Sequence, residues 1–320
     1  MEGVQWPRVR RLLPLLLVLT LCAPPPSPTG APASGSLVRI YVGGPADGSL
    51  AARARMLTSA TDAQIVARPA RRGAEALGEL VGHDDDRTLA AVAGPDTIAA
   101  ALLERASPRL ESMVPVARIA SDALVIAVAA SSPVADIASL RRHLQREASA
   151  VRFAGSAVGS IEHQLAALLV KEAAGGVRPL VFAAYGSAAD AGAGVSGGQS
   201  DVLVARYGDA KPLLQKGLRA LAVSSAERLP GLDLPTLRES QIDIALVDWA
   251  VLVAPPRVSG DDVAGLRELA RRAHASSLWS DAVKKNVFVD DFSTDGMTTF
   301  VGVEISRATA LLRELALVRD

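Results

Sequence analysis

Apolar residues in this chain fall into two patterns that alternate along most of its length. Short uninterrupted apolar runs are typical of buried strands, whereas apolar residues at every third or fourth position are typical of amphipathic helices. A run at 37–42 precedes a helical pattern from Leu50, and predicted strands at 88–93 and 150–154 also precede predicted helices. This alternation predicts an α/β fold in which helices cover both faces of a mostly parallel sheet.

The same rhythm continues through the centre of the chain, and the C-terminal part is then mostly helical. These last helices are expected to pack back on the first lobe. A chain of 320 residues is longer than one hydrophobic core usually serves, so two lobes are expected. The remaining predicted elements are helices at 96–104, 160–173, 187–193, 263–274, 278–285 and 300–317, and strands at 179–183, 200–205 and 218–223.

The beginning of the chain has the pattern of a secretory signal peptide. Three arginines within 8–11 precede an apolar run at 12–23, which is too short to span a bilayer. The small-residue pattern at 31–33 is typical of a signal-peptidase site, so we expect a removable leader at 1–33. The leader therefore predicts that the protein is exported from the cytoplasm.

The single cysteine, Cys22, offers an alternative for the leader, because a lipidated cysteine would stand at this place. Leu21 argues against lipidation, since lipoprotein signals have a small residue there. We therefore favour plain cleavage over an anchor through Cys22. After cleavage the chain has no cysteine, which excludes disulfides and thiolate metal sites.

Composition narrows the classes of partner. Lysines and arginines number 34, as do aspartates and glutamates, so no bulk charge attracts the chain to nucleic acid or to an anionic membrane. Four histidines stand far apart without metal-ligand spacing, so no metal and no cofactor are expected. Recognition must therefore come from a local site.

Two glycine motifs superficially suggest catalysis. Residues 192–197 satisfy G-x-G-x-x-G, and 194–198 satisfy G-x-S-x-G. Both would have to follow a strand and open a helix, whereas this stretch closes a predicted helix and precedes a strand. No nucleophile, base and orienting acid can be assembled either, so an enzyme is not predicted.

Glycine- and serine-rich loops at 43–49 and 155–160 follow predicted strands. In open α/β sheets, ligands bind beyond the carboxyl ends of strands, where loops lead into helix N-termini with unpaired N–H groups. The positive end of the helix dipole suits small anions. These two loops are therefore the candidate ligand loops.

Several short motifs follow one another in a fixed order from residue 150 onward. They are Phe153-Ala154, Gly159-Ser160 with His163, Tyr185 with Asp190, Gly197-Gly198-Gln199 with Asp201, the strand at 217–223, Leu234-Pro235-Thr236, and Trp249 with Ala254-Pro255. In this order they resemble the substrate-binding receptors of tripartite tricarboxylate transporters, the Bug family of bacterial periplasmic proteins.

The resemblance implies a type II periplasmic binding protein-like fold, with two α/β lobes joined by hinge strands and a ligand cleft between them. We expect lobe one at 34–128 and 250–320, lobe two at 129–249, and hinge strands at 123–128 and 248–253. It also implies a monomeric receptor, not an enzyme, that captures a small carboxylate ligand for membrane permease subunits of the transporter. The alternative is a ligand-sensing receptor that acts in signalling.

In such receptors loop amides and hydroxyls hold the carboxylate. The structural alternatives are turns for the glycines, a helix N-cap for Ser160 and a stabilised strand entry for Asp201. His163, beside the second loop, is interpreted as structural. The resemblance implies as ligand-binding residues Gly44, Gly48 and Ser49 from lobe one and Ser156, Gly159 and Ser160 from lobe two, with Tyr185 and Asp201 as second choices.

The first lobe departs from the family pattern at two loops. The loop after the first strand is short, and Gly48-Ser49 stands where the family has Thr-Asp. A second glycine-rich stretch is replaced by 70–73, which contains Arg71 and Arg72. These arginines could pair with a polyanionic ligand or belong to a hydrated loop. The identity of the ligand therefore stays open.

Overall fold

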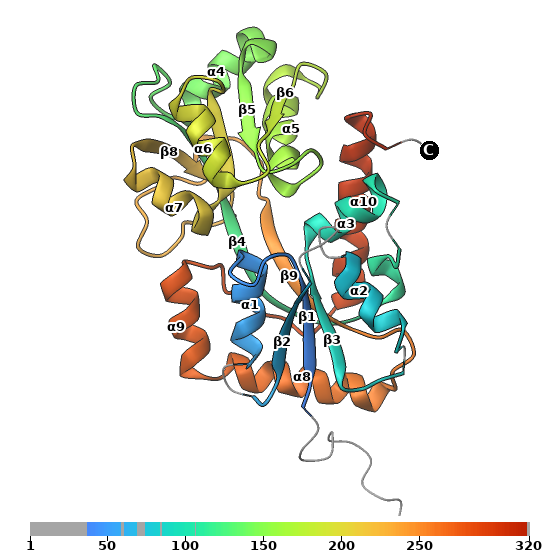
Figure 1. Cartoon of the computed structure of the whole chain (residues 1–320). Coiled ribbons are helices and arrows are strands. Elements are labelled where there is room, and N and C mark those ends of the chain that lie inside the picture. Colours follow the sequence, from blue (N-terminus) through green and yellow to red (C-terminus); the bar gives the residue numbers. More distant parts are fainter. Residues whose placement is uncertain (1–36, 59–60, 69–73, 84, 106, 319–320) are drawn as a thin grey trace, which may run out of the picture.

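Two lobes, each built on a sheet covered by helices, lie one above the other in the computed structural model (Figure 1). The structure describes residues 37–318 except 59–60, 69–73, 84 and 106. The predictions for the leader at 1–33, for Cys22, and for Arg71 and Arg72 concern residues outside this description.

The sheet of lobe one has the strand order β2-β1-β3-β9-β4. Strand β1 runs parallel to β2 and β3, whereas β9 is antiparallel to both of its neighbours. Every residue of β3 is buried, as its unbroken apolar run predicts. The strands are β1 Arg39–Gly43, β2 Gln64–Arg68, β3 Leu89–Ala93, β4 Val114–Ala129 and β9 Val247–Ala254.

Strand β4 belongs to both sheets. Its first part, up to Ala123, pairs with β9, and its second part, from Leu124, pairs with β7 and β8. The second sheet therefore has the order β8-β4-β7-β5-β6. Its other strands are β5 Arg152–Gly155, β6 Val181–Ala184, β7 Val202–Arg206 and β8 Leu218–Val223.

The pairing in β4 changes partners at the start of the predicted hinge strand at 123–128. The chain returns to lobe one at β9, which pairs with β3 and with the first part of β4. The loops that follow β1, β3, β5 and β7 consequently meet where the two sheets join. The boundaries between the lobes, at residues 128 and 249, remain predictions from the sequence.

Helices cover both sheets, and the predicted helix ends lie within about three residues of the observed ones. The helices of lobe two are α4 Ile137–Glu147, α5 Ile161–Ala174, α6 Ala188–Ser196 and α7 Tyr207–Gln215. Those of lobe one are α1 Ser49–Thr58, α2 Ala74–Val81, α3 Pro95–Leu103, α8 Gly260–His274, α9 Ser277–Asn286 and α10 Met297–Glu314.

The terminal helices pack on lobe one, as the pattern predicts, but α10 also contacts lobe two. Val301 and Ala308 of α10 join a core cluster of lobe one. Leu311, one turn further on, packs against Ala167 of α5 and Val177. The last helix therefore lies across the join between the lobes (Figure 1).

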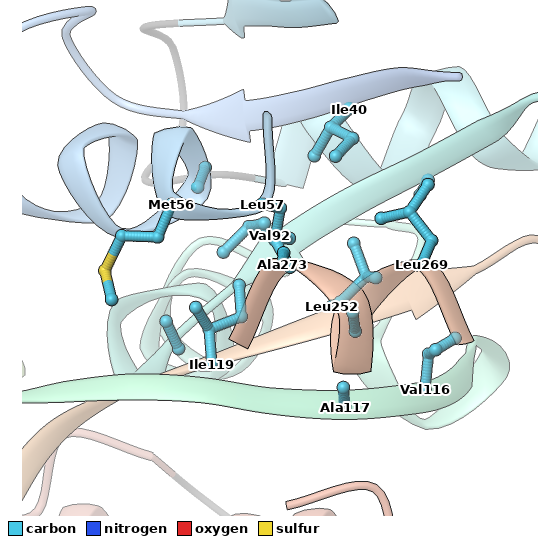
Figure 2. Close-up of a cluster of buried hydrophobic side chains, with 14 of the residues drawn as sticks. Ile40, Met56, Leu57, Val92, Val116, Ala117, Ile119, Leu252, Leu269 and Ala273 are labelled. Carbon is cyan, nitrogen blue, oxygen red and sulfur yellow. The ribbon is translucent and has the colours of Figure 1, made fainter. Parts of the chain in front are cut away.

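The main core of lobe one lies between its sheet and helices α1 and α8. Figure 2 shows Ile40, Leu57, Leu252 and Leu269 within this cluster. Each is buried, and burying such a side chain contributes about 1.5 to 3 kcal/mol. This packing holds β1 and β9 in place. The end of β1 and the beginning of β9 lie at the edge of lobe one that faces lobe two (Figure 1).

Replacing Leu252 tests this core directly. Leu252→Ala should lower the free energy of unfolding by about 2 to 5 kcal/mol, because a fully buried side chain leaves a cavity. Urea unfolding measures the change. The matched control is Leu278→Ala on α9, whose side chain is 51% exposed and whose loss should cost less than about 0.5 kcal/mol. Equal losses would contradict the assignment of the core.

Candidate ligand-binding cleft

A cleft of about 560 Å³ lies where the strand ends of the two lobes meet. This volume is within the range that holds small organic ligands. The lining residues come from loops after β1, β3, β5, β6 and β7 and from the first residue positions of β9. They include Gly44, Pro45, Gly48, Ser49, Gly94, Asp96, Ser156, Ser187, Ala188, Ala189, Arg206, Gly208, Asp209 and Asp248.

Two glycines let the backbone form the lobe-one wall. Gly44 has a φ of +112°, which L side chains rarely adopt, and so allows the sharp turn after β1. At Gly94 a Cβ atom would lie 3.0 Å from the carbonyl oxygen of Trp249. The loop after β3 can therefore pass close to β9, which brings the start of α3 into the cleft.

Arg206, at the end of β7, is the cation of the cleft. Its Nε donates to Asp248 at 2.7 Å, its Nη2 to Asp96 at 2.8 Å and its Nη1 to Glu162 at 2.5 Å. Asp96 belongs to α3 of lobe one, Glu162 to α5 of lobe two, and Asp248 to β9. Each of the three nitrogens of the guanidinium group thus donates to a carboxylate of the protein itself.

Asp96 also closes the N-terminal end of α5. Its Oδ1 accepts a hydrogen bond of 3.2 Å from the backbone N–H of Ile161, the first residue of that helix. Helix N-termini attract anions through unpaired N–H groups and the helix dipole. The carboxylate of Asp96, from lobe one, therefore occupies the place at the N-terminus of α5 where an anionic ligand could otherwise bind.

A second arginine, Arg53 of α1, lies fully buried below the cleft. It donates to a carboxylate oxygen of Asp248 at 2.6 Å and to the backbone oxygen of the same residue. Burial opposes ionisation of Asp248, but the guanidinium groups of Arg206 and Arg53 outweigh it and hold its pKa below the usual value. Asp248 is thus a charged bridge between the two arginines.

Asp122 of β4 is fully buried beside this network. Its Oδ2 accepts a 2.8 Å hydrogen bond from the hydroxyl of Ser49, whereas its Oδ1 has no hydrogen-bond partner within the described residues. Burial raises the pKa of Asp122 to about 7, although Arg53 and Ser49 oppose this shift. Burial likewise raises the pKa of Glu162.

Four of the eight predicted ligand-binding residues line the cleft: Gly44, Gly48, Ser49 and Ser156. The hydroxyls of both serines already have protein partners. Ser49 donates to Asp122, and Ser156 donates to Glu162 at 3.1 Å. These two serines thus orient carboxylates at the wall of the cleft.

Gly159 and Ser160 lie outside the lining of the cleft. A Cβ atom at Gly159 would come within 2.3 Å of Leu103, so this glycine permits a close contact with lobe one. Its N–H donates to Nδ1 of His163 at 2.8 Å. Ser160 is 1% exposed and is the N-cap of α5, where its hydroxyl accepts from the N–H of His163. Both positions therefore build the helix start.

Tyr185 and Asp201 also lie outside the lining. The hydroxyl of Tyr185 forms a 3.0 Å hydrogen bond with Ser200, and its ring packs against the position of Gly194. Asp201 pairs with Arg152 at 2.9 Å and accepts from the backbone N–H of the same residue, which ties the start of β7 to β5. Tyr185 and Asp201 thus hold neighbouring segments of lobe two together.

The charged cleft residues Asp96, Arg206, Asp209 and Asp248 were absent from the predicted site. Asp96 and Arg206 each stand at or just after the carboxyl end of a predicted strand, at 88–93 and 200–205. Ligands of open α/β sheets bind beyond the carboxyl ends of strands, and this rule, which selects the two glycine-rich loops, applies equally to Asp96 and Arg206. What the sequence does not give is their partner, because Asp96 and Arg206 are 110 positions apart.

Two α/β lobes with a polar cleft between them define a solute-binding protein. The sequence pattern of the tripartite tricarboxylate transporter family receptors, TctC, matches residues 81–317, and the chain belongs to this family. No curated relative matches the sequence. None of the described helices is long and apolar enough to cross a membrane. The receptors of this family are substrate-binding proteins and not enzymes.

Solved structures share the fold at low sequence identity. A TctC solute binding protein from Polaromonas has a TM-score of 0.71 at 19% identity, over 87% of this chain and 98% of that one. MatC from Rhodopseudomonas palustris with bound malate has 0.69 at 20%, over 86% and 98%. Rpa4515 of the same species with adipate has 0.73 at 21%, over 88% and 98%. The predicted fold class is confirmed.

The buried carboxyl group of Asp122 generates a pH prediction. Its raised pKa means that between about pH 4 and pH 7 the folded protein holds a proton that the unfolded chain releases. The contribution of Asp122 to stability therefore falls as pH rises through this interval. Asp122→Asn should gain stability relative to wild type, by about 2 to 4 kcal/mol from pH 4 to pH 7.

Urea unfolding across this pH range measures the difference between Asp122→Asn and wild type. Asp261→Asn on α8 is the matched control, because Asp261 is exposed and lies on the far side of lobe one. Its stability curve should run parallel to that of wild type. A parallel curve for Asp122→Asn as well would show that Asp122 ionises normally.

Proposed function

We propose that this receptor captures a small solute bearing a carboxylate in the periplasm and delivers it to membrane permease subunits of a tripartite tricarboxylate-type transporter. Export rests on the sequence of the leader at 1–33. Capture rests on the cleft between the lobes. The receptor is proposed to act as a monomer, and uptake is preferred to signalling because the family functions in transport.

The observation that carries the proposal is the N-terminus of α6 at the wall of the cleft. Ser187, Ala188 and Ala189 line the cleft, and Ser187 is the N-cap of this nine-residue helix. The hydroxyl of Ser187 accepts from the N–H of Asp190, so it leaves the N–H groups of Ala188 and Ala189 to other acceptors. A carboxylate is the natural partner for such a pair.

Helix α1 supports the proposal from the opposite lobe. Its first residues, Ser49 and Leu50, line the same cleft, so the positive ends of two helix dipoles face one space. In contrast to α5, neither helix end receives a carboxylate of the protein at its first N–H group within the described residues. A ligand carboxylate between α1 and α6 would lie in favourable potential from both lobes.

The structural neighbours support a carboxylate as the ligand class. MatC is described with bound malate and Rpa4515 with adipate, both small dicarboxylates. Lobe closure around such a ligand would exclude water and strengthen each hydrogen bond. Charge-assisted hydrogen bonds contribute about 1.5 to 3 kcal/mol each, so a few of them suffice for specific capture.

A single backbone donor can be removed to test this function. Ala188 is the first residue of α6, where proline is well tolerated and merely lacks the N–H group. Ala188→Pro should weaken the binding of a carboxylate ligand by about tenfold, the loss of one charge-assisted bond, without lowering the melting temperature. Ligands are first found by thermal shift with di- and tricarboxylates, amino acids and aromatic acids, and affinities then follow by calorimetry.

The matched control is Gly260→Pro at the first position of α8, outside the cleft. It should leave the affinity unchanged. If the ligand binds wild type and Ala188→Pro with equal affinity, the N-terminus of α6 does not contact the ligand. No stabilisation by any carboxylate would contradict the proposed function.

A further inference from the structure

The end of α10 shares a small apolar cluster with lobe two, beside α5 (Figure 1). Leu311 of α10 packs against Ala167 of α5 and against Val177, and all three side chains are buried. At the rim, Nζ of Lys171 on α5 donates to Glu314 of α10 at 2.7 Å. Burial of this cluster therefore requires contact between the lobes. The partly buried side chains around it are Leu168, Leu180 and Leu315.

The turn before α5 makes a second apolar contact with lobe one. Gly159 has a φ of +80°, and a Cβ atom there would lie 2.3 Å from Leu103 of α3 and 3.6 Å from Leu312 of α10. The backbone of lobe two thus lies directly against two side chains of lobe one. The same loop carries Ser156, which lines the cleft. Helices α3 and α10 therefore hold in place a loop that faces the solute.

A chain of hydrogen bonds runs from β9 through α10 to the same turn. Glu304 of α10 accepts from Nε1 of Trp249 at 2.7 Å and from Nη2 of Arg307 at 2.8 Å. Nη1 of Arg307 donates to the side-chain oxygen of Gln164 on α5 at 3.4 Å. Gln164 is fully buried, and its amide nitrogen donates to the backbone oxygen of Gly159 at 3.1 Å. Polar and apolar contacts thus fasten the same place.

The side of the cleft formed by α1, α6 and α7 lacks comparable contacts. Ser49 and Leu50 of α1 line it from lobe one, and Ser187 and Ala188 line it from lobe two. The hydroxyl of Ser49 donates to Asp122 of β4. Within the described residues, no hydrogen bond or ion pair joins α1 to α6 or α7. The contacts between the lobes are therefore concentrated at α3, α5 and α10.

We propose that the end of α10 is a clasp that keeps lobe two against lobe one at α5 throughout solute capture. The lobes part along the other side, between α1 and the pair α6 and α7, and the solute enters there. Leu103 and Leu311 are positioning residues of the clasp, because neither lines the cleft. The entry side rests on the proposed function, whereas the clasp itself is tested without a solute.

The chemistry of the two sides explains why they differ. Separation at α10 would expose the apolar cluster around Leu311 to water and would leave the buried Gln164 without Arg307. Separation between α1 and α6 would expose mainly glycine, serine and alanine at the cleft wall. The apparent affinity of a receptor falls with the fraction of molecules in the binding-competent arrangement. A lasting clasp keeps the lobe-two loop in that arrangement.

The first experiment measures the clasp without any solute. Spin labels replace Lys171 and Glu314 in full-length protein that carries Cys22→Ser, which removes the only cysteine. Pulsed electron paramagnetic resonance should give one narrow distance distribution. Leu311→Ala should broaden it toward longer distances, and Leu311→Met should restore it. The matched control is Val301→Ala, which shortens a buried side chain of the same helix within lobe one and should leave the distances unchanged.

The second experiment adds malate or adipate as the probe. A second label pair replaces Asp47 and Lys211, which are exposed and stand beside the lining residues Pro45, Gly48 and Pro212. Binding should shorten the distances of this pair and leave those between 171 and 314 unchanged. Joining cysteines at 171 and 314 by a short bismaleimide should keep the affinity for the probe within about twofold, because the competent fraction does not fall.

The possible failures can be told apart. Equal distance changes in Leu311→Ala and Val301→Ala would overturn the clasp, as would a probe that changes the distances between 171 and 314. Loss of binding after the bismaleimide reaction would show that the lobes must part at α10. A bound probe that leaves the distances between 47 and 211 unchanged overturns the entry side. If neither probe binds, the proposed function fails for these solutes, and the Leu311 variants still decide the clasp.

Discussion

The guanidinium group of Arg206 is shared among three carboxylates that come from three separate parts of the chain. Asp96 reaches it from α3 of lobe one, Glu162 from α5 of lobe two, and Asp248 from β9 where the sheets join. Charged groups of low exposure are stable only when paired, so the lobes are positioned by this contact. The same contact holds the cation of the cleft in a fixed position.

Asp96 links the two lobes by occupying a helix N-terminus. The N-terminus of α5 is a ready anion site, and in this protein the carboxylate of Asp96 occupies it by accepting from Ile161. The N-termini of α1 and α6 also line the cleft, and within the described residues neither receives a protein carboxylate at its first N–H group. The receptor thus has two lobes and a cleft whose wall carries the N-termini of α1 and α6.

Most strands and helices were predictable because their apolar patterns are local, whereas α2, α7 and β2 were not among the predicted elements. Gly44 and Ser156 were also predictable, since both follow strand ends. Tyr185 and Asp201 belong to motifs shared with the family, but their contacts with Ser200 and Arg152 hold neighbouring segments together. A motif fixes residue type and order and does not say whether the partner is a ligand or the protein.

The central claim is that Asp96, Glu162 and Asp248 hold the guanidinium group of Arg206 within the protein, so that backbone N–H groups at helix N-termini receive the ligand carboxylate. A crystal structure with the tightest-binding solute tests it most directly. The account predicts that Nη2 of Arg206 stays within hydrogen-bond distance of Asp96, as in the 2.8 Å contact described above, and that a ligand carboxylate contacts the N-terminus of α6. A structure in which Arg206 has left Asp96 to bind a ligand carboxylate would contradict the account.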